Sequence, residues 1–304
     1  MTATHLRPDF SYLSRTFQPL GHGLHFSAPP PGDITSARYL ASQDPWEAMG
    51  CILARLQGGA FDTIEDIPRV LGRNDGALIW AGGMQLLGLA APWSVLRPLA
   101  QQLVGERRRP EIQINVPEML QYAMAPWAVD LLLDIHAAAF AEGRAHLVHS
   151  CLSRLIEPVA GLVDAGPERI ETPDPDYPPE FGEMIIHHET EAYREAVRLI
   201  AAGMFAEQGG GVLAIAEGEI FDLGAMAGRM HERLCREQGR SGRFDLERMV
   251  FEATTGIECN AFYSEDWKLD RLAAMAVLED FLESGKAAEF ERGRRYFFGH
   301  RVPD

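Results

Sequence analysis

The chain has 304 residues, an apolar content of 46% and a formal net charge of −16 at pH 7. This length suits two lobes or one helical solenoid, and the apolar content excludes a disordered protein. The negative charge opposes binding to nucleic acid or to an anionic membrane surface, and it favours a positively charged partner.

Four cysteines lie far apart in the sequence, at Cys51, Cys151, Cys235 and Cys259, without a C-x-x-C pair. This spacing argues against a zinc ribbon and against a dense disulfide framework. Residues 1–17 also lack the uninterrupted apolar core of a secretory signal. We therefore expect a cytoplasmic protein.

Residues 1–43 contain Pro8, Pro19 and the run Pro29-Pro30-Pro31-Gly32, which predicts an irregular N-terminal arm. The pattern changes at Asp44, a residue type that caps helices, followed by Pro45 and by Glu47 three residues after the cap. An apolar stripe then predicts a helix over 45–57; its members are Met49, Ile52, Leu53 and Leu56.

The dipeptide Pro-Trp occurs three times at the predicted start of an apolar helix, at Pro45-Trp46, Pro92-Trp93 and Pro126-Trp127. Proline is favoured at the first helical position, and these starts are 47 and 34 residues apart, a spacing typical of helical-hairpin repeats. We predict an all-α fold of stacked antiparallel helical hairpins. Further helices are expected over 64–72, 76–90, 92–104, 117–124, 126–142 and 144–163.

Residues 76–96 carry no charge and are long enough to span a bilayer. Gly82, Gly83 and Pro92 interrupt this stretch, and Pro92 reads as the start of a new helix. The pattern therefore favours a buried pair of helices over a membrane span, and we expect no membrane partner.

The sharpest change of composition lies at residues 164–195, which hold ten acidic residues and only two basic ones, a net charge of −8. The proline-rich part over 164–180 predicts an extended acidic linker between an N-terminal lobe at 44–163 and a C-terminal lobe at 181–304. Such a run is either a solvated spacer or an acidic contact strip. The second alternative predicts partner contacts through Asp174, Asp176, Tyr177, Glu180 and Glu183, with Tyr263, Glu265, Asp266 and Trp267 as a second patch.

In the C-terminal lobe, helical spacing predicts helices over 180–208, 219–238, 245–255 and 265–284. The first has an apolar stripe of Tyr193, Val197, Ile200, Ala201 and Met204, and Leu272 is among the packing residues of the last. Residues 294–301 form a tail of aromatic and basic residues. We expect this tail to dock on the core.

Three groups of residues carry potential chemistry. Glu183, His187, His188 and Glu191 could share one face of the helix predicted over 180–208 and ligate a metal, although a solvated surface cluster explains the same spacing. The run from His231 to Cys235 departs from the H-E-x-x-H zinc motif, because Cys235 replaces the second histidine. His146 and His149 lie near Cys151 and could supply a base next to a cysteine nucleophile, but the sequence pattern offers no third group to orient them.

The helical body from Asp44 to about Glu291 and the tail after it resemble the larger helical immunity proteins of bacterial polymorphic-toxin and type VI secretion systems, which often have HEAT-like folds. The resemblance implies a non-catalytic cytosolic protein without a cofactor. Its partner would be a cognate toxin domain, whose active site or substrate access it blocks. The alternatives are a helical metal-dependent enzyme that uses the Glu183 cluster with help from His231, and a generic protein-binding scaffold.

Overall fold

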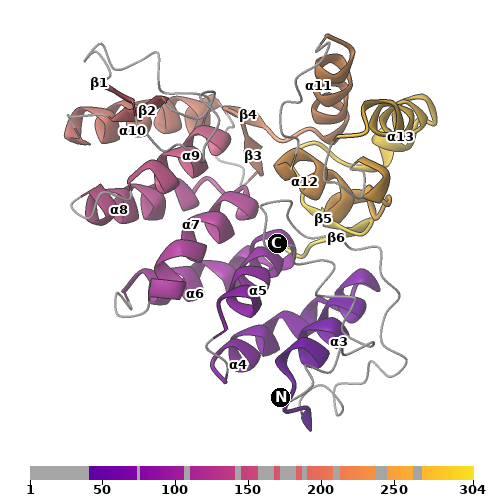
Figure 1. Cartoon of the computed structure of the whole chain (residues 1–304), viewed down its shortest axis with the longest axis horizontal. Helices are drawn as coiled ribbons and strands as arrows, with labels where there is room; N and C mark the ends of the chain where they lie inside the picture. Colours follow the sequence, from indigo (N-terminus) through magenta and orange to yellow (C-terminus); the bar gives the residue numbers. More distant parts are fainter. Residues whose placement is uncertain are drawn as a thin grey trace. The chain divides into compact units, whose positions relative to one another are not determined.

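The computed structural model describes residues 41–73, 76–105, 110–140, 145–156, 168–171, 183–186, 190–207, 213–236, 245–262 and 269–304. Helices dominate this part of the chain and its strands are short, so the predicted all-α fold is confirmed (Figure 1). The HEAT-like repeat order stays a prediction.

The contacts divide the chain into two compact units. Unit 1 contains the described residues up to Leu96 together with Asp222–Asp304, and unit 2 is Arg97–Phe221. This grouping differs from the predicted lobes at 44–163 and 181–304, because the C-terminal residues of the chain pack against the first helices. Most of the predicted linker at 164–180 lies outside the described residues.

Helix α3 (Pro45–Gln57) of unit 1 begins and ends as predicted. The backbone N–H of Trp46 donates to the Asp44 carboxylate at an N···O distance of 3.0 Å, which satisfies one of the amides left over at a helix start. The predicted stripe of Met49, Ile52, Leu53 and Leu56 is fully buried. Local capping and apolar spacing therefore define this helix together.

The uncharged stretch forms the buried helix α5 (Ala77–Ala90) and the start of α6 (Trp93–Gly105), as predicted. Ahead of them lie the 3-10 helix η2 (Phe61–Asp66) and α4 (Ile67–Leu71). Helices α5 and α6 are separated at Ala91, whose backbone is extended. This is the conformation that a residue before a proline, here Pro92, prefers. Among the described helices, none has the length and apolar composition needed to cross a membrane.

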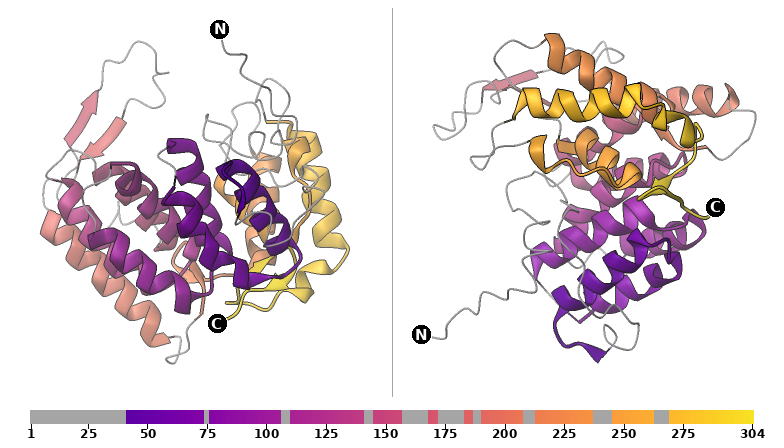
Figure 2. Two further views of the ribbon diagram at one scale, coloured as in Figure 1. Left: turned by 90° about the horizontal axis from the view of Figure 1, so that it is seen from below. Right: turned by 90° about the vertical axis from the view of Figure 1, so that its right-hand side faces the viewer.

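The C-terminal part of unit 1 contains α11 (Leu223–Arg236), α12 (Asp245–Thr255), the 3-10 helix η5 (Asn260–Phe262), α13 (Arg271–Glu283) and the 3-10 helix η6 (Lys286–Glu289). Helices α11 and α13 lie side by side (Figure 2). The prediction that Leu272 packs in the core is wrong, because α13 buries Ala274, Leu278 and Phe281 and leaves Leu272 77% exposed.

The chain ends in a hairpin of β5 (Tyr296–Phe297) and β6 (His300–Arg301). Its two turn residues, Phe298 and Gly299, have φ values of 50° and 77°, as the tight turns that suit twisted hairpins require. The backbone N–H groups of Phe298 and Gly299 donate to the carbonyls of Ala253 and Thr254 at the end of α12, and Phe297 is fully buried. The predicted docking of the tail on the core is confirmed.

Unit 2 contains α7 (Pro110–Ala123), α8 (Ala128–Phe140), α9 (Ala145–Leu155) and α10 (Thr190–Glu207). Helix α9 packs against α7 and α8, and α10 packs against α8. The helix predicted over 117–124 starts earlier, at Pro110, and runs through Pro117. Packing against α8 and α9 outweighs the cost of a proline inside the helix.

Two hairpins of unit 2 include residues that were predicted as helix or as linker. Strands β1 (Glu168–Glu171) and β2 (Glu183–Ile186) pair antiparallel, with Glu168 opposite Ile186 and Glu171 opposite Glu183 (Figure 2). The helix predicted over 180–208 is therefore wrong at its start and begins at Thr190.

The second hairpin joins β3 (Ile215–Ala216) to β4 (Glu219–Ile220) through Glu217 and Gly218, whose φ values are 52° and 82°. Residues 219–220, predicted as the start of a helix, therefore belong to a strand. The N–H groups of Glu217 and Gly218 donate to the carbonyls of Arg154 and Leu155, which satisfies the end of α9.

Candidate functional site

Most of the predicted partner contacts lie outside the described residues. This holds for Asp174, Asp176, Tyr177 and Glu180 of the acidic strip and for Tyr263, Glu265, Asp266 and Trp267 of the second patch. Glu183 lies in β2, where it is paired with Glu171 of β1. The predicted contacts therefore remain predictions.

The four residues of the alternative metal cluster do not share one helix. Glu183 belongs to β2 and Glu191 to α10, while His187 and His188 lie outside the described residues. The expected common helical face was wrong because the strand replaces the first turns of the predicted helix. Within the described ranges, no group of three or more His, Cys, Asp or Glu residues could hold a metal ion.

His231 and Cys235, from the altered zinc motif, meet a carboxylate on the neighbouring helix. The Nε2 atom of His231 in α11 lies 2.9 Å from Oε1 of Glu279 in α13. The Sγ atom of the exposed Cys235 lies 3.8 Å from Nε2 and 3.9 Å from Nδ1 of His231. The three residues thus form a small polar cluster on the surface of the α11–α13 pair.

The geometry of this cluster does not suit nucleophilic catalysis. A base that activates a thiol holds it along the in-plane direction of one ring nitrogen, and a third group orients the base through the other nitrogen. Here Sγ is almost equally distant from both nitrogens, so it lies off the hydrogen-bonding direction of either, while Glu279 occupies Nε2. We therefore interpret the cluster as a hydrogen bond between side chains of neighbouring helices with a thiol beside it.

The predicted group of His146, His149 and Cys151 lies in α9. Within this helix, His149 packs against an aromatic residue of another helix. Its ring stacks on Tyr193 of α10, with centroids 5.1 Å apart, and His136 of α8 lies 5.0 Å from the same tyrosine. Tyr193 is fully buried, and burial raises the pKa of its hydroxyl well above the usual range. These three rings join α8, α9 and α10 in the interior of unit 2.

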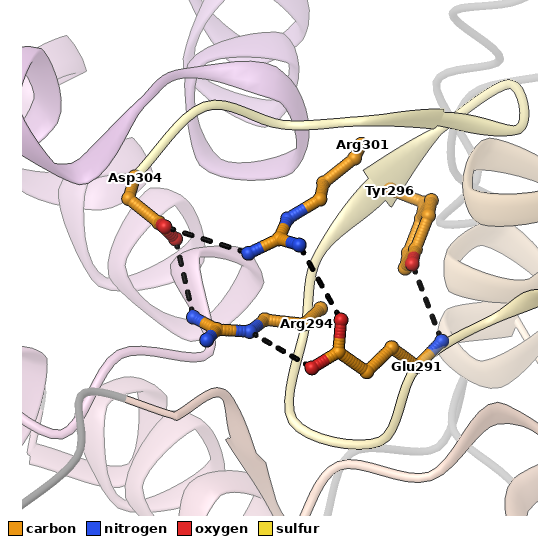
Figure 3. Close-up of polar contacts among 5 residues, drawn as sticks. All are labelled: Glu291, Arg294, Tyr296, Arg301 and Asp304. Atoms are coloured by element: carbon orange, nitrogen blue, oxygen red, sulfur yellow. Dashed lines mark hydrogen bonds and ion pairs between the residues drawn. The ribbon is translucent and has the colours of Figure 1, made fainter.

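The tail presents a network of charges in which Glu291, Arg301 and Asp304 are exposed and Arg294 is half-buried (Figure 3). Arg294 lies 3.5 Å from Glu291 and 3.3 Å from Asp304, and Arg301 lies 3.3 Å from Glu291 and 3.5 Å from Asp304. The backbone N–H of Glu291 also donates to the Tyr296 hydroxyl, at 3.2 Å. Two arginines are thus balanced by two carboxylates, so the network offers a partner little uncompensated charge.

Arg295, the neighbour of Arg294, points inward instead. Its guanidinium donates to the carbonyls of Gly88 and Ala91 at the end of α5 and lies 5.7 Å from the ring centroid of Trp93. Burial lowers the pKa of Arg295 to about 9, so the side chain keeps its charge at neutral pH. A cation at a helix C-terminus is electrostatically favourable, and this one also occupies carbonyls that α5 leaves without an internal donor.

The two units differ strongly in charge. Unit 2 has 20 acidic and nine basic residues, a net charge of −11, whereas unit 1 has 24 acidic and 19 basic residues, a net charge of −5. In the described part of unit 2, Asp130 and Asp134 stand one turn apart on the exposed side of α8. Unit 2 is therefore where a cationic molecule meets the strongest attraction.

The fold and these polar groups define a predominantly helical, acidic protein. No protein-family model matches the chain, and no curated protein or solved structure matches it either. The resemblance to helical immunity proteins accordingly stays an expectation from helical pattern and charge.

Sequence reasoning missed the roles of Arg295 and Tyr193. Arg295 stands in the run Arg294-Arg295-Tyr296, where nothing in the sequence distinguishes the buried arginine from its half-buried neighbour. Tyr193 occupies the apolar stripe of a predicted helix, and that signal shows burial but not the two histidines beside it. Both roles depend on contacts between residues that are far apart in the sequence.

Proposed function

We propose that this chain is a non-catalytic immunity protein that binds and neutralises a cognate bacterial toxin domain with a basic surface. The observation that carries the proposal is the charge of unit 2, which amounts to −11 within Arg97–Phe221. Toxin domains that act on nucleic acid or nucleotides need a basic surface, and an acidic binder associates with such a surface faster and more selectively.

The acidic strip and the second patch are the proposed contacts. Asp174, Asp176, Glu180 and Glu183 would steer the encounter, and Tyr177 would act as an aromatic anchor, with Tyr263 and Trp267 in the same role in the second patch. No cofactor or metal enters this mode of action. The site of action would be the cytoplasm, where the toxin would otherwise act.

Co-expression tests the function directly. Cells that produce the toxin domain encoded beside this chain's gene should survive when the chain is present, and the two purified proteins should form a complex. Cells left unprotected by the intact chain would refute the immunity function.

Salt and charge reversal test the basis of the proposal. Association should slow as the ionic strength rises, because screening shortens the range of the attraction. The double variant Asp130→Lys and Asp134→Lys in unit 2 should lower the association rate by roughly threefold to tenfold. The matched variant Glu283→Lys and Glu289→Lys changes two exposed acidic residues of unit 1 and should have a much smaller effect. Equal effects of the two pairs would contradict the assignment of the attraction to unit 2.

A further inference from the structure

Helix α10 has one buried face and one face open to solvent. Tyr193, Val197 and Ala201, spaced by four residues, are buried. On the opposite side, exposed residues recur at helical spacing; they are Glu195, Arg198, Leu199, Ala202, Gly203 and Ala206. These six residues are called the outer face of α10 below.

Leu199 stands at the centre of the outer face and is 66% exposed. In the part of the chain that the structure describes, it shares this degree of exposure with one other large apolar residue, Leu272, which belongs to unit 1. The fold gains nothing from an apolar side chain kept in water, because apolar side chains stabilise a protein through burial.

Gly203 follows Leu199 by one helical turn. Apart from the backbone of its own helix and its two chain neighbours, a Cβ atom added at Gly203 would meet no atom within 4 Å, so no packing neighbour requires a glycine there. Glycine is also a poor choice inside a helix, because it loses more backbone freedom on folding than alanine does. The outer face therefore combines a projecting apolar side chain with a neighbouring position at which another molecule can approach the helix backbone closely.

The charge of unit 2 indicates which kind of molecule would bind at the outer face. Helix α10 begins within the acidic segment at residues 164–195. Its Glu195, one turn before Leu199, is 60% exposed. Arg198, 3.5 Å from Glu195, balances that single carboxylate, but unit 2 as a whole keeps its charge of −11. An apolar anchor within a negative field fits a protein surface that presents an apolar pocket ringed by lysine or arginine.

We propose that the outer face of α10 is the surface on which unit 2 binds a cationic protein domain, with Leu199 filling an apolar pocket of that domain and Gly203 allowing close approach. This inference rests on the proposed function, and it adds a structured apolar contact to the acidic residues that steer the encounter. The division of roles is specific: acidic residues set the association rate, and Leu199 sets the lifetime of the complex.

The experiment measures binding of the full chain to the toxin domain encoded by the neighbouring gene, with the toxin's active site inactivated, by a method that resolves both rates. Leu199→Asn removes the apolar side chain without changing charge and should speed dissociation at least tenfold, with little change in association. Leu272→Asn is the matched control, because Leu272 is an exposed leucine of the other unit, and it should leave both rates unchanged. Ala202→Arg places a bulky cation on the outer face and should abolish the complex.

Circular dichroism and thermal unfolding of each variant establish that the fold is intact, as the exposure of all three positions predicts. Dissociation rates that are unchanged by Leu199→Asn, or changed equally by Leu272→Asn, would overturn the inference while leaving the proposed function standing. An intact chain that does not bind the toxin domain would overturn the proposed function and this inference with it.

Discussion

Arg295 is the residue through which the end of the chain is held against α5. Replacing it in the variant Arg295→Met removes the donors to the Gly88 and Ala91 carbonyls and leaves both of them buried. Because an unsatisfied buried polar group costs about 1–3 kcal/mol, we expect the free energy of unfolding to fall by about 2–4 kcal/mol. Urea denaturation at neutral pH measures this loss.

Arg294 provides the control for that measurement. It belongs to the charge network of Figure 3, where ion pairs contribute about 1 kcal/mol or less, so Arg294→Met should change the stability by no more than that. A similar loss for both variants would show that the orientation of Arg295 is not what stabilises the tail.

Tyr193 should give the protein a specific loss of stability at alkaline pH. Burial raises the pKa of its hydroxyl, so the folded protein keeps the proton at a pH where the unfolded chain, with a tyrosine pKa near 10, releases it. The unfolded state then binds fewer protons than the native state, and stability decreases as the pH rises above about 10, by up to roughly 1.4 kcal/mol per pH unit.

The variant Tyr193→Phe has no hydroxyl to ionise and should show a shallower decline over the same range. Unfolding free energies of the two proteins between pH 8 and pH 11 make the comparison, since all other groups are shared. Parallel curves would mean that Tyr193 ionises normally in the folded protein.

At the scale of elements, two helical glycines with opposite surroundings give a matched test. A Cβ atom added at Gly83 of α5 would lie 2.8 Å from a methyl carbon of Leu71, a buried residue of α4, whereas Gly203 of α10 has open space. Gly83→Ala should therefore destabilise the protein by about 1–3 kcal/mol through overpacking. Gly203→Ala should stabilise it by about 0.5–1 kcal/mol. Thermal unfolding distinguishes the two signs, and a destabilising Gly203→Ala would contradict the open space found on α10.

The helices that the sequence predicted best are those with complete local signals. Helix α3 has its cap, its first-turn proline and its apolar stripe within a dozen residues, and α12 also has the predicted bounds. Helix α7 was predicted too short because Pro117, a typical first residue, lies inside it. The start of α10 was misplaced because β1, the partner of β2, lies well upstream of it, and strand pairing of that kind leaves no periodic signal in so short a segment.

The candidate site was predictable only in its charge. The acidic strip is a feature of composition and can be read from residue types alone, whereas the outer face of α10 depends on which side of the helix packs against α8. The helical spacing of apolar residues correctly predicted the buried side of α10, which includes Tyr193, Val197 and Ala201. It could not show that Leu199, an apolar residue of the same helix, is left in water.

At the scale of the whole molecule, unit 1 is discontinuous in sequence. The chain leaves it after Leu96, forms unit 2, and returns at Asp222. Contacts between the two parts of unit 1 include Arg295 with the end of α5, and the ring of His300 with Gly59, where an added Cβ would lie 3.1 Å from the imidazole. The last residues of the chain therefore complete a structure that begins with its first described helices.

Removing residues 294–304 should consequently loosen unit 1 and spare unit 2. The deletion takes away the cation at the end of α5, the buried side chains of Phe297 and Val302, and the backbone bonds to the carbonyls of Ala253 and Thr254. Each buried apolar side chain contributes about 1.5–3 kcal/mol, so the total loss approaches the 5–15 kcal/mol by which a typical domain is stable. Hydrogen exchange should show lost protection in α5 and α12 with protection retained in α8 and α9. A control that lacks only the exposed Pro303 and Asp304 should behave like the full chain, and equal loss of protection in both units after the long deletion would show that they unfold as one.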